Sequence, residues 1–311
     1  MDYRSLLEKT AKENNSISCM GIDPNFSSLP EGVSVDAYYV TLLEEIKNKG
    51  IGIASYKPNI GYFSRLDKPL DGDFSGSKAL ASIIKALPSS PFILDSKRGD
   101  IATSSANYAF EAFGCWKADA VTVSPYMGHD SISPFAVGYE EKGVYILNRT
   151  SNPGGKDLQN KAMEDGKPLY MVVAETIAKW NEEYSGGIGA VVGATNLKEF
   201  EDLALFYSKK EIPLLIPGVG SQGGSAEEVI SIMKRVGYPL HLARINSSSA
   251  LTHPWAKKKE KAPENWKDVC LSAIEKFAKE CALRKRAFLW DTKREKSISL
   301  LSAAWLQQRL S

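Results

Sequence analysis

The amino-acid sequence predicts a (β/α)8 barrel, and three observations support this fold class. Eight short, apolar, β-rich runs recur along the chain, and each is followed by polar residues, glycine or proline. Most of the segments between these runs carry apolar residues at helical spacing. The length of 311 residues suits one large α/β barrel. A doubly wound open sheet is the alternative, since the choice between the two depends on the strand count.

The expected strands follow one another at intervals that leave room for a helix. We expect strands at residues 17–22, 53–56, 92–94, 120–123, 144–147, 190–192, 214–216 and 240–243. We expect helices over 36–49, around 80–87, from 225 onward, and over 266–283. The polar stretch 154–167 is expected to be a mobile loop or lid after the fifth strand. The lysine-rich stretch 253–264 is expected to be a solvated loop.

The chain divides at the end of the last expected helix. The barrel is expected to span residues 1–283, and residues 284–311 form a C-terminal tail with no place in a minimal barrel. Apolar residues between 298 and 306 have helical spacing, so the tail is expected to be an amphipathic helix. Such a helix would pack on the barrel, contact a partner, or belong to a linker toward a further domain.

Composition excludes several classes of function. The chain is 43% hydrophobic and 24% charged with a net charge of +2, so neither a nucleic-acid nor a membrane surface is expected. Four scattered cysteines and three histidines show no metal-ligand spacing, so no metal is expected. The N-terminus does not resemble a signal peptide, and no apolar run approaches membrane-spanning length. A cytoplasmic protein with free thiols is the expectation.

The stretch 92–101 combines a buried strand with a cluster of charge. Residues two apart in a strand share a face, so Asp95 and Lys97 are expected to project together. Gly99 allows a sharp turn, and Asp100 follows it. If the fold is a barrel, these charges lie at the C-terminal rim, where active sites of barrels are found. The simpler interpretation is a surface salt bridge, with Asp100 as a helix N-cap.

A second stretch favours phosphate binding. Residues 217–224 follow the seventh expected strand and contain four glycines, which let backbone N–H groups approach a ligand closely. A helix is expected to start at Ser225, and helix N-termini attract anions. Arg244 is expected at the end of the eighth strand, where it would supply a cation. The alternative is a flexible glycine loop and a surface arginine. The GxGxxG spacing of dinucleotide sites is absent.

Three motifs together resemble one known family. They are DxKxxDI at 95–101, NRTSNPG at 148–154 and PGVGSQG at 217–223. In this order at strand ends they are similar to the orotidine 5′-phosphate decarboxylases, and in particular to the longer, divergent subgroup of that family. The resemblance runs from about residue 21 to residue 244, and the tail lies outside it. It implies a (β/α)8 barrel that needs no cofactor.

The resemblance also implies roles for individual residues. The alternating charge network of the catalytic site would be formed by Lys57, Asp95, Lys97 and Asp100. Asp100 and Ile101 would reach across the interface of a homodimer with shared active sites. The remaining substrate contacts would come from Asp23 on the ribose hydroxyls, Ser151 on the pyrimidine edge, Gly218, Gly220, Gln222 and Arg244 on the phosphate, and Ser104, or its neighbour Thr103, on the partner's ribose.

The implied reaction fits these residues. Loss of CO₂ from carbon 6 of the orotate ring leaves a carbanion, which Lys97 would stabilise and then protonate. A fused or associated orotate phosphoribosyltransferase is the partner that the resemblance suggests, since its product is the substrate. Three alternatives stay open: a Schiff-base aldolase with Lys97 as the nucleophile, a metal-dependent sugar-phosphate decarboxylase or synthase of the same superfamily, and a non-catalytic phosphate-binding barrel. Flanking carboxylates stabilise the ammonium form of Lys97, which disfavours the aldolase.

Overall fold

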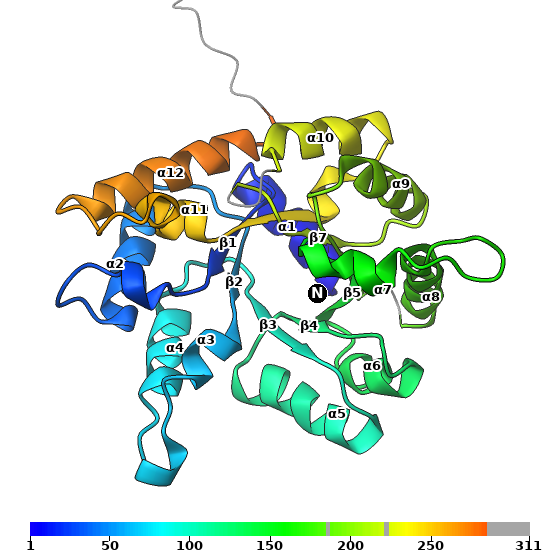
Figure 1. The fold of residues 1–311 in the computed structure, drawn as a ribbon, viewed down its shortest axis with the longest axis horizontal. Coiled ribbons are helices and arrows are strands. Elements are labelled where there is room, and N and C mark those ends of the chain that lie inside the picture. Colours follow the sequence, from blue (N-terminus) through cyan, green and yellow to red (C-terminus); the bar gives the residue numbers. More distant parts are fainter. Residues whose placement is uncertain (185–186, 221–223, 285–311) are drawn as a thin grey trace, which may run out of the picture.

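The computed structural model describes residues 1–184, 187–220 and 224–284, and its centre is a barrel of parallel strands (Figure 1). The strands are β1 (Ser18–Ile22), β2 (Ser55–Pro58), β3 (Ile93–Arg98), β4 (Ala120–Val123), β5 (Gly143–Arg149), β6 (Ile188–Val192), β7 (Leu214–Ile216) and β8 (Ala243–Ser247). They pair in the order β2-β1-β8-β7-β6-β5-β4-β3. Single bridges from Tyr56 to Phe92 and from Asn59 to Asp95 bring β2 against β3 and nearly close the barrel. The predicted fold class is confirmed.

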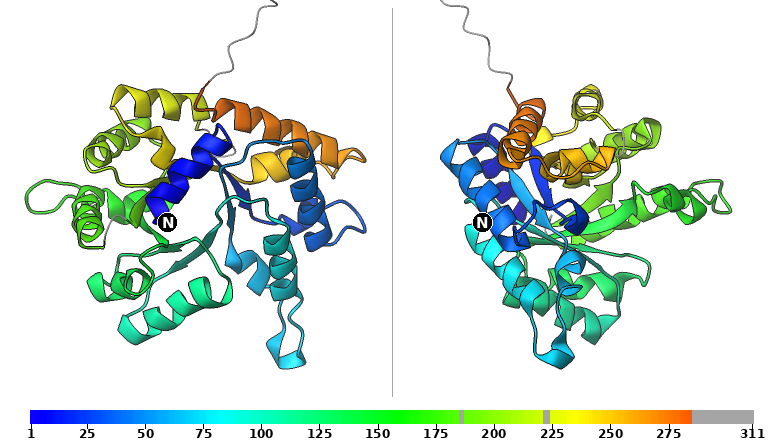
Figure 2. Two further views of the ribbon diagram at one scale, coloured as in Figure 1. Left: turned by 180° about the vertical axis from the view of Figure 1, so that it is seen from behind. Right: turned by 60° about the vertical axis from the view of Figure 1, so that its left-hand side comes forward.

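Helices surround the strands on the outside (Figures 1 and 2). They are α1 (Tyr3–Glu13), α2 (Val35–Asn48), α3 (Ile60–Ser64), α4 (Ser75–Ala86), α5 (Ala102–Ala109), α6 (His129–Ala136), α7 (Lys156–Gln159), α8 (Leu169–Glu183), α9 (Leu197–Ser208), α10 (Ala226–Arg235), α11 (Ser249–Thr252) and α12 (Trp266–Glu280). Side-chain caps mark several starts, as when the Ser34 hydroxyl accepts from Ala37 N–H. No helix of the described residues is long and apolar enough to cross a membrane.

Helix α1, which the sequence analysis did not predict, covers the N-terminal ends of the strands (Figure 2, left). Its Tyr3 hydroxyl donates to the Tyr145 hydroxyl at 3.2 Å. Gly143 starts β5, and a Cβ there would lie only 2.4 Å from the Tyr3 ring. The barrel is therefore closed at this end, and access to its interior is from the opposite, C-terminal end.

Two expectations for the C-terminal part of the barrel are wrong. Residues 240–242 form a 3-10 helix and not the eighth strand, which starts at Ala243. The apolar run after Pro239 is too short to tell a strand from a turn of helix. The stretch 253–264 is not simply solvated, because Trp255 is buried and its Nε1 donates to the Ser28 carbonyl at 2.9 Å. The tail beyond Arg284 lies outside the described residues.

Candidate active site

A cavity of about 920 Å³ opens at the C-terminal ends of the strands. This volume is in the range of sites for small molecules. Of the residues predicted from the sequence, the cavity is lined by Asp23, Lys57, Asp95, Lys97, Ser151 and Gly218. These six residues come from the ends of five different strands or the loops that follow them, so the barrel brings together positions that are far apart in the sequence.

Asp95 is the centre of the charge network. Its Oδ2 lies 2.6 Å from Lys57 Nζ, and its Oδ1 lies 2.6 Å from Lys97 Nζ. The Thr122 hydroxyl donates to the same Oδ1 at 2.8 Å. Lys57 and Asp95 are buried, whereas the Lys97 side chain is 48% exposed at the cavity. One carboxylate therefore fixes two ammonium groups, and one of the two faces the space where a ligand would bind.

The backbone of β3 departs from a regular strand to place Lys97. The register with β4 shifts between Leu94 and Arg98, and Lys97 has a φ of +46°. Thr122 Oγ1 accepts the backbone N–H groups of Ser96 and Lys97 at 3.1 and 3.0 Å. Asp95 and Lys97 meet as predicted, but through this irregularity and not through strand alternation. A left-handed conformation at a lysine is strained, and such strain is common at functional sites.

The network shifts the pKa values of its buried members. Burial disfavours the charged form of Asp95, but the nearby Lys57 and Lys97 outweigh burial and hold the pKa of Asp95 well below its usual range. Burial likewise acts against the charged form of Lys57, but Asp23 and Asp95 outweigh it and raise the pKa of Lys57. Both groups are therefore ionised at neutral pH.

Two oxygen atoms at the cavity are without partners among the described residues. They are Asp23 Oδ1 and Asn246 Oδ1, each buried as an atom and each belonging to a residue that lines the cavity. Buried polar atoms are normally hydrogen-bonded. These oxygens are therefore free to accept hydrogen bonds from a ligand's hydroxyl or N–H groups.

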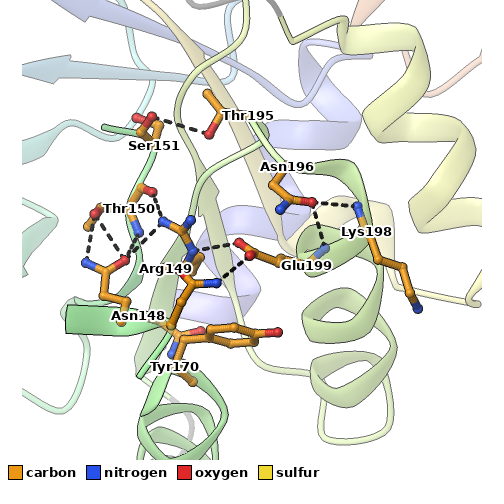
Figure 3. A network of polar contacts seen from close by, with 11 residues as sticks. Asn148, Arg149, Thr150, Ser151, Tyr170, Thr195, Asn196, Lys198 and Glu199 are labelled. Atoms are coloured by element: carbon orange, nitrogen blue, oxygen red, sulfur yellow. Dashed lines mark hydrogen bonds and ion pairs between the residues drawn. The ribbon is translucent and has the colours of Figure 1, made fainter. Parts of the chain in front are cut away.

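Ser151 lies at the end of β5, close to the chain that follows β6 (Figure 3). The Thr195 hydroxyl donates to the Ser151 carbonyl at 3.3 Å. Gly193 is required here, because a Cβ at this position would lie 2.8 Å from the backbone nitrogen of Ser151. The serine is thus held at the cavity wall by close packing of two strand ends.

Arg244 is not at the cavity, which corrects the predicted phosphate contact. It is the second residue of β8 and is fully buried at the opposite end of the barrel. Its Nη2 donates to the Leu7 carbonyl and the Thr10 hydroxyl of α1, both at 2.8 Å. The error follows from the wrong position of the eighth strand, which placed Arg244 at the strand's end instead of its beginning.

The other predicted residues are placed differently. Asp100, Ile101 and Ser104 do not line the cavity of their own chain, and Asp100 Oδ1 accepts the N–H of Ile101 at 2.7 Å. Gly220 has a φ of +92°, and its backbone N–H donates to the Gly224 carbonyl at 2.9 Å. Gln222 lies outside the described residues.

Sequence reasoning missed Thr122 and Asn246. Thr122 is the one polar residue of the buried strand β4, and this pattern was the available signal. Asn246 could not be found, because it belongs to the strand that was misplaced. The described residues contain no group of three His, Cys, Asp or Glu side chains that could hold a metal ion.

The fold and site define a (β/α)8 barrel with a Lys-Asp-Lys array at its C-terminal rim. The family model described as "Orotidine 5′-phosphate decarboxylase / HUMPS family" matches residues 33–235. The chain belongs to this family, which confirms the resemblance. Orotidine 5′-phosphate decarboxylase of Herpetosiphon aurantiacus is 41% identical over 225 residues, covering 71% of this chain and 80% of the relative. The orotidine 5′-phosphate decarboxylase of Delftia acidovorans is 38% identical over 259 residues, covering 81% of this chain and 90% of the relative.

Solved structures of similar chains agree with this assignment. The OMP decarboxylase of Leishmania donovani is 30% identical with a TM-score of 0.68, covering 90% of this chain and 99% of that chain. The UMP synthase of the same organism is 31% identical with a TM-score of 0.71, covering 90% of this chain and 56% of the longer protein.

Proposed function

We propose that this protein converts orotidine 5′-phosphate to uridine 5′-phosphate and CO₂ in de novo pyrimidine biosynthesis. The observation that carries the proposal is the Lys57–Asp95–Lys97 array at the cavity of a barrel of this family. Relatives named orotidine 5′-phosphate decarboxylase, identical at about two positions in five, support it.

Lys97 is the proposed catalytic acid. Breaking the bond between carbon 6 and the carboxylate leaves the electron pair on carbon 6, and an ammonium group beside that atom stabilises the developing charge. Lys97 then donates a proton to carbon 6, which completes the product. Asp95 holds the ammonium in place, and Lys57 and Thr122 hold Asp95. No cofactor takes part in this mechanism.

The substrate would lie across the cavity with its ribose near β1 and its base near β5. Asp23, with its unpartnered oxygen, is the proposed acceptor for ribose hydroxyls. Ser151 is the proposed contact to the pyrimidine edge. The phosphate would lie after β7, where Gly218 lines the cavity and the positive φ values of Gly218 and Gly220 let the backbone approach a ligand closely, with Gln222 as a further contact.

We further propose a homodimer in which each site takes residues from both subunits. Asp100, Ile101 and Ser104 follow β3 but lie outside their own cavity, so they are free to enter a neighbour's. Ile101 is 49% exposed, and Tyr126 in the loop after the adjacent strand β4 is 83% exposed. Exposed large apolar side chains on neighbouring loops are typical of interaction surfaces.

The reaction that supplies the substrate is the transfer of a phosphoribosyl group to orotate. A fused or associated orotate phosphoribosyltransferase is therefore the proposed partner. The similarity to a UMP synthase that is longer than this chain supports this proposal.

The test is an absorbance assay with purified protein and orotidine 5′-phosphate, with and without EDTA. The proposal predicts loss of substrate absorbance at the same rate in both samples. Activity that EDTA abolishes would favour a metal-dependent sugar-phosphate decarboxylase or synthase of the same superfamily. Nucleotide binding without turnover would favour a non-catalytic barrel.

A further inference from the structure

A buried polar network lies next to Ser151 and joins Arg149, at the end of β5, to Glu199 of α9 (Figure 3). Arg149, the last residue of β5, is only 9% exposed, and its Nε donates to Glu199 Oε2 of α9 at 2.7 Å. Asn160 Nδ2 donates to the other carboxylate oxygen at 2.7 Å. Both oxygens of Glu199 are therefore engaged: an ion pair joins β5 to α9, and a hydrogen bond joins α9 to the residue after α7.

The same network makes hydrogen bonds to the carbonyl, the backbone N–H and the hydroxyl of Thr150. Arg149 Nη1 donates to the Thr150 carbonyl at 2.7 Å. Gln159 Oε1 accepts the Thr150 N–H at 2.9 Å, and Gln159 Nε2 donates to the Thr150 hydroxyl at 2.8 Å. Thr150 lines the cavity and immediately precedes Ser151. Its backbone has no freedom to rotate without breaking these bonds, so the position of Ser151 is fixed as well.

We propose that Arg149, Glu199 and Gln159 are positioning residues that hold Thr150 and Ser151 in the geometry that binds the substrate's base. This inference rests on the proposed function. A buried ion pair contributes little net stability, because desolvation of the two charges offsets their attraction. Its specific effect is on geometry, and pre-organised contacts improve binding by removing the cost of ordering the site.

The network also determines the packing of the loop after β5, which was expected to be mobile. This loop contains a 3-10 turn (Pro153–Gly155) followed by α7, which carries Gln159. A Cβ at Gly155 would lie 2.8 Å from Arg149 Nη1, 2.9 Å from Thr150 Oγ1 and 3.0 Å from Gln159 Oε1. The absence of a side chain at Gly155 therefore provides the space that the polar groups of the network occupy. At Gly154 a Cβ would make only ordinary contacts, the nearest at 3.5 Å.

Steady-state kinetics on orotidine 5′-phosphate separate positioning from stability. Glu199→Gln removes the charge that orients Arg149, and it should raise KM about tenfold while kcat changes by less than about threefold. The matched control is Glu201→Gln on the same helix. Glu201 Oε1 lies 2.9 Å from Nη2 of Arg235, and the Arg235 side chain is exposed. That control should leave both constants unchanged. A purely structural role would reduce the amount of folded enzyme, and so lower the apparent kcat without changing KM.

A second pair of variants perturbs the network by shape alone. Gly155→Ala should raise KM in the same way as Glu199→Gln, and Gly154→Ala should match the wild type. Should Glu199→Gln fail to fold, Gln159→Ala at a partly exposed position decides the question. Binding of uridine 5′-phosphate, measured by calorimetry, should weaken in parallel with KM.

The outcomes distinguish this inference from the proposed function. An inactive wild-type protein would overturn the proposed function, and this inference with it. An active wild type with unchanged KM in Glu199→Gln, Gly155→Ala and Gln159→Ala would overturn the inference alone.

Discussion

Lys57 Nζ lies 2.6 Å from Asp95 Oδ2, and both side chains are only 6% exposed. Breaking one half of such a buried pair leaves an uncompensated charge, which is far costlier than losing an exposed pair. Asp95 also holds Lys97 at the same distance, so the array carries two positive charges and one negative charge. The ionisation of Asp95 therefore controls both stability and the position of the proposed catalytic acid.

The first prediction concerns the pH dependence of stability. The folded-state pKa of Asp95 is lowered from 3.8, so the unfolded chain binds the proton more tightly. The contribution of Asp95 to the free energy of unfolding is complete above the unfolded-state pKa of 3.8, and it is lost as the pH falls from there through the folded-state pKa. Wild type should exceed Asp95→Asn in free energy of unfolding by a constant amount from about pH 5 to 8, and this difference should shrink below about pH 4. Urea unfolding at each pH measures it; a constant difference down to about pH 2 would contradict the assignment.

The second prediction concerns Thr122, which accepts two backbone N–H groups of β3 and donates to Asp95. Thr122→Val keeps the shape but removes the hydroxyl, so the left-handed turn at Lys97 loses its support. Turnover should fall by about tenfold, the equivalent of one buried hydrogen bond. Thr122→Ser is the matched control and should retain most of the activity. Equal activity of the valine and serine variants would show that the hydroxyl is not needed.

The third prediction concerns Arg244. Its guanidinium donates to the carbonyls of Leu7, His241 and Ala243 and to Thr10, and burial lowers its pKa. Arg244→Ala leaves several buried acceptors unpaired and a cavity beneath α1, so the free energy of unfolding should fall by about 3 kcal/mol or more. The folded variant should bind uridine 5′-phosphate as the wild type does. A selective loss of nucleotide binding with unchanged stability would contradict this structural role of Arg244.

The fourth prediction concerns the shared site of the proposed dimer. Asp100→Ala and Lys97→Ala proteins should each be nearly inactive, yet a mixture unfolded and refolded together should regain activity. In a mixed dimer one site receives both lesions and the other receives neither. Random pairing makes about half of the dimers mixed, so about a quarter of wild-type sites should return. If mixed dimers form without any gain in activity, Asp100 acts within its own chain.

Much of the fold was predictable because buried parallel strands are continuous apolar runs with clear ends. The strands predicted at 120–123 and 214–216 have the same bounds in the structure. The eighth strand was not predictable in this way, because β8 contains the polar residues Arg244, Asn246 and Ser247 and is therefore not a continuous apolar run. Helix α1 was missed although Tyr3, Leu7 and Ala11 are spaced as on one helical face.

The candidate site was predictable where a motif places charge at a strand end, as for Asp95 and Lys97. It was not predictable where function depends on contacts between distant segments. Thr122 meets Asp95 only because β3 and β4 pair, and Arg149 meets Glu199 only because the end of β5 lies near the first turn of α9. Neither pair has a local sequence pattern that joins its members.

The most direct test of the account is the turnover of orotidine 5′-phosphate by Lys97→Ala. Lys97 is half exposed, so its removal should leave the barrel folded, as circular dichroism and thermal melting would verify. Without the ammonium group, neither charge stabilisation at carbon 6 nor proton donation can occur, and the rate should fall by roughly 1000-fold or more. Near-normal turnover by a folded Lys97→Ala protein would contradict the proposed mechanism.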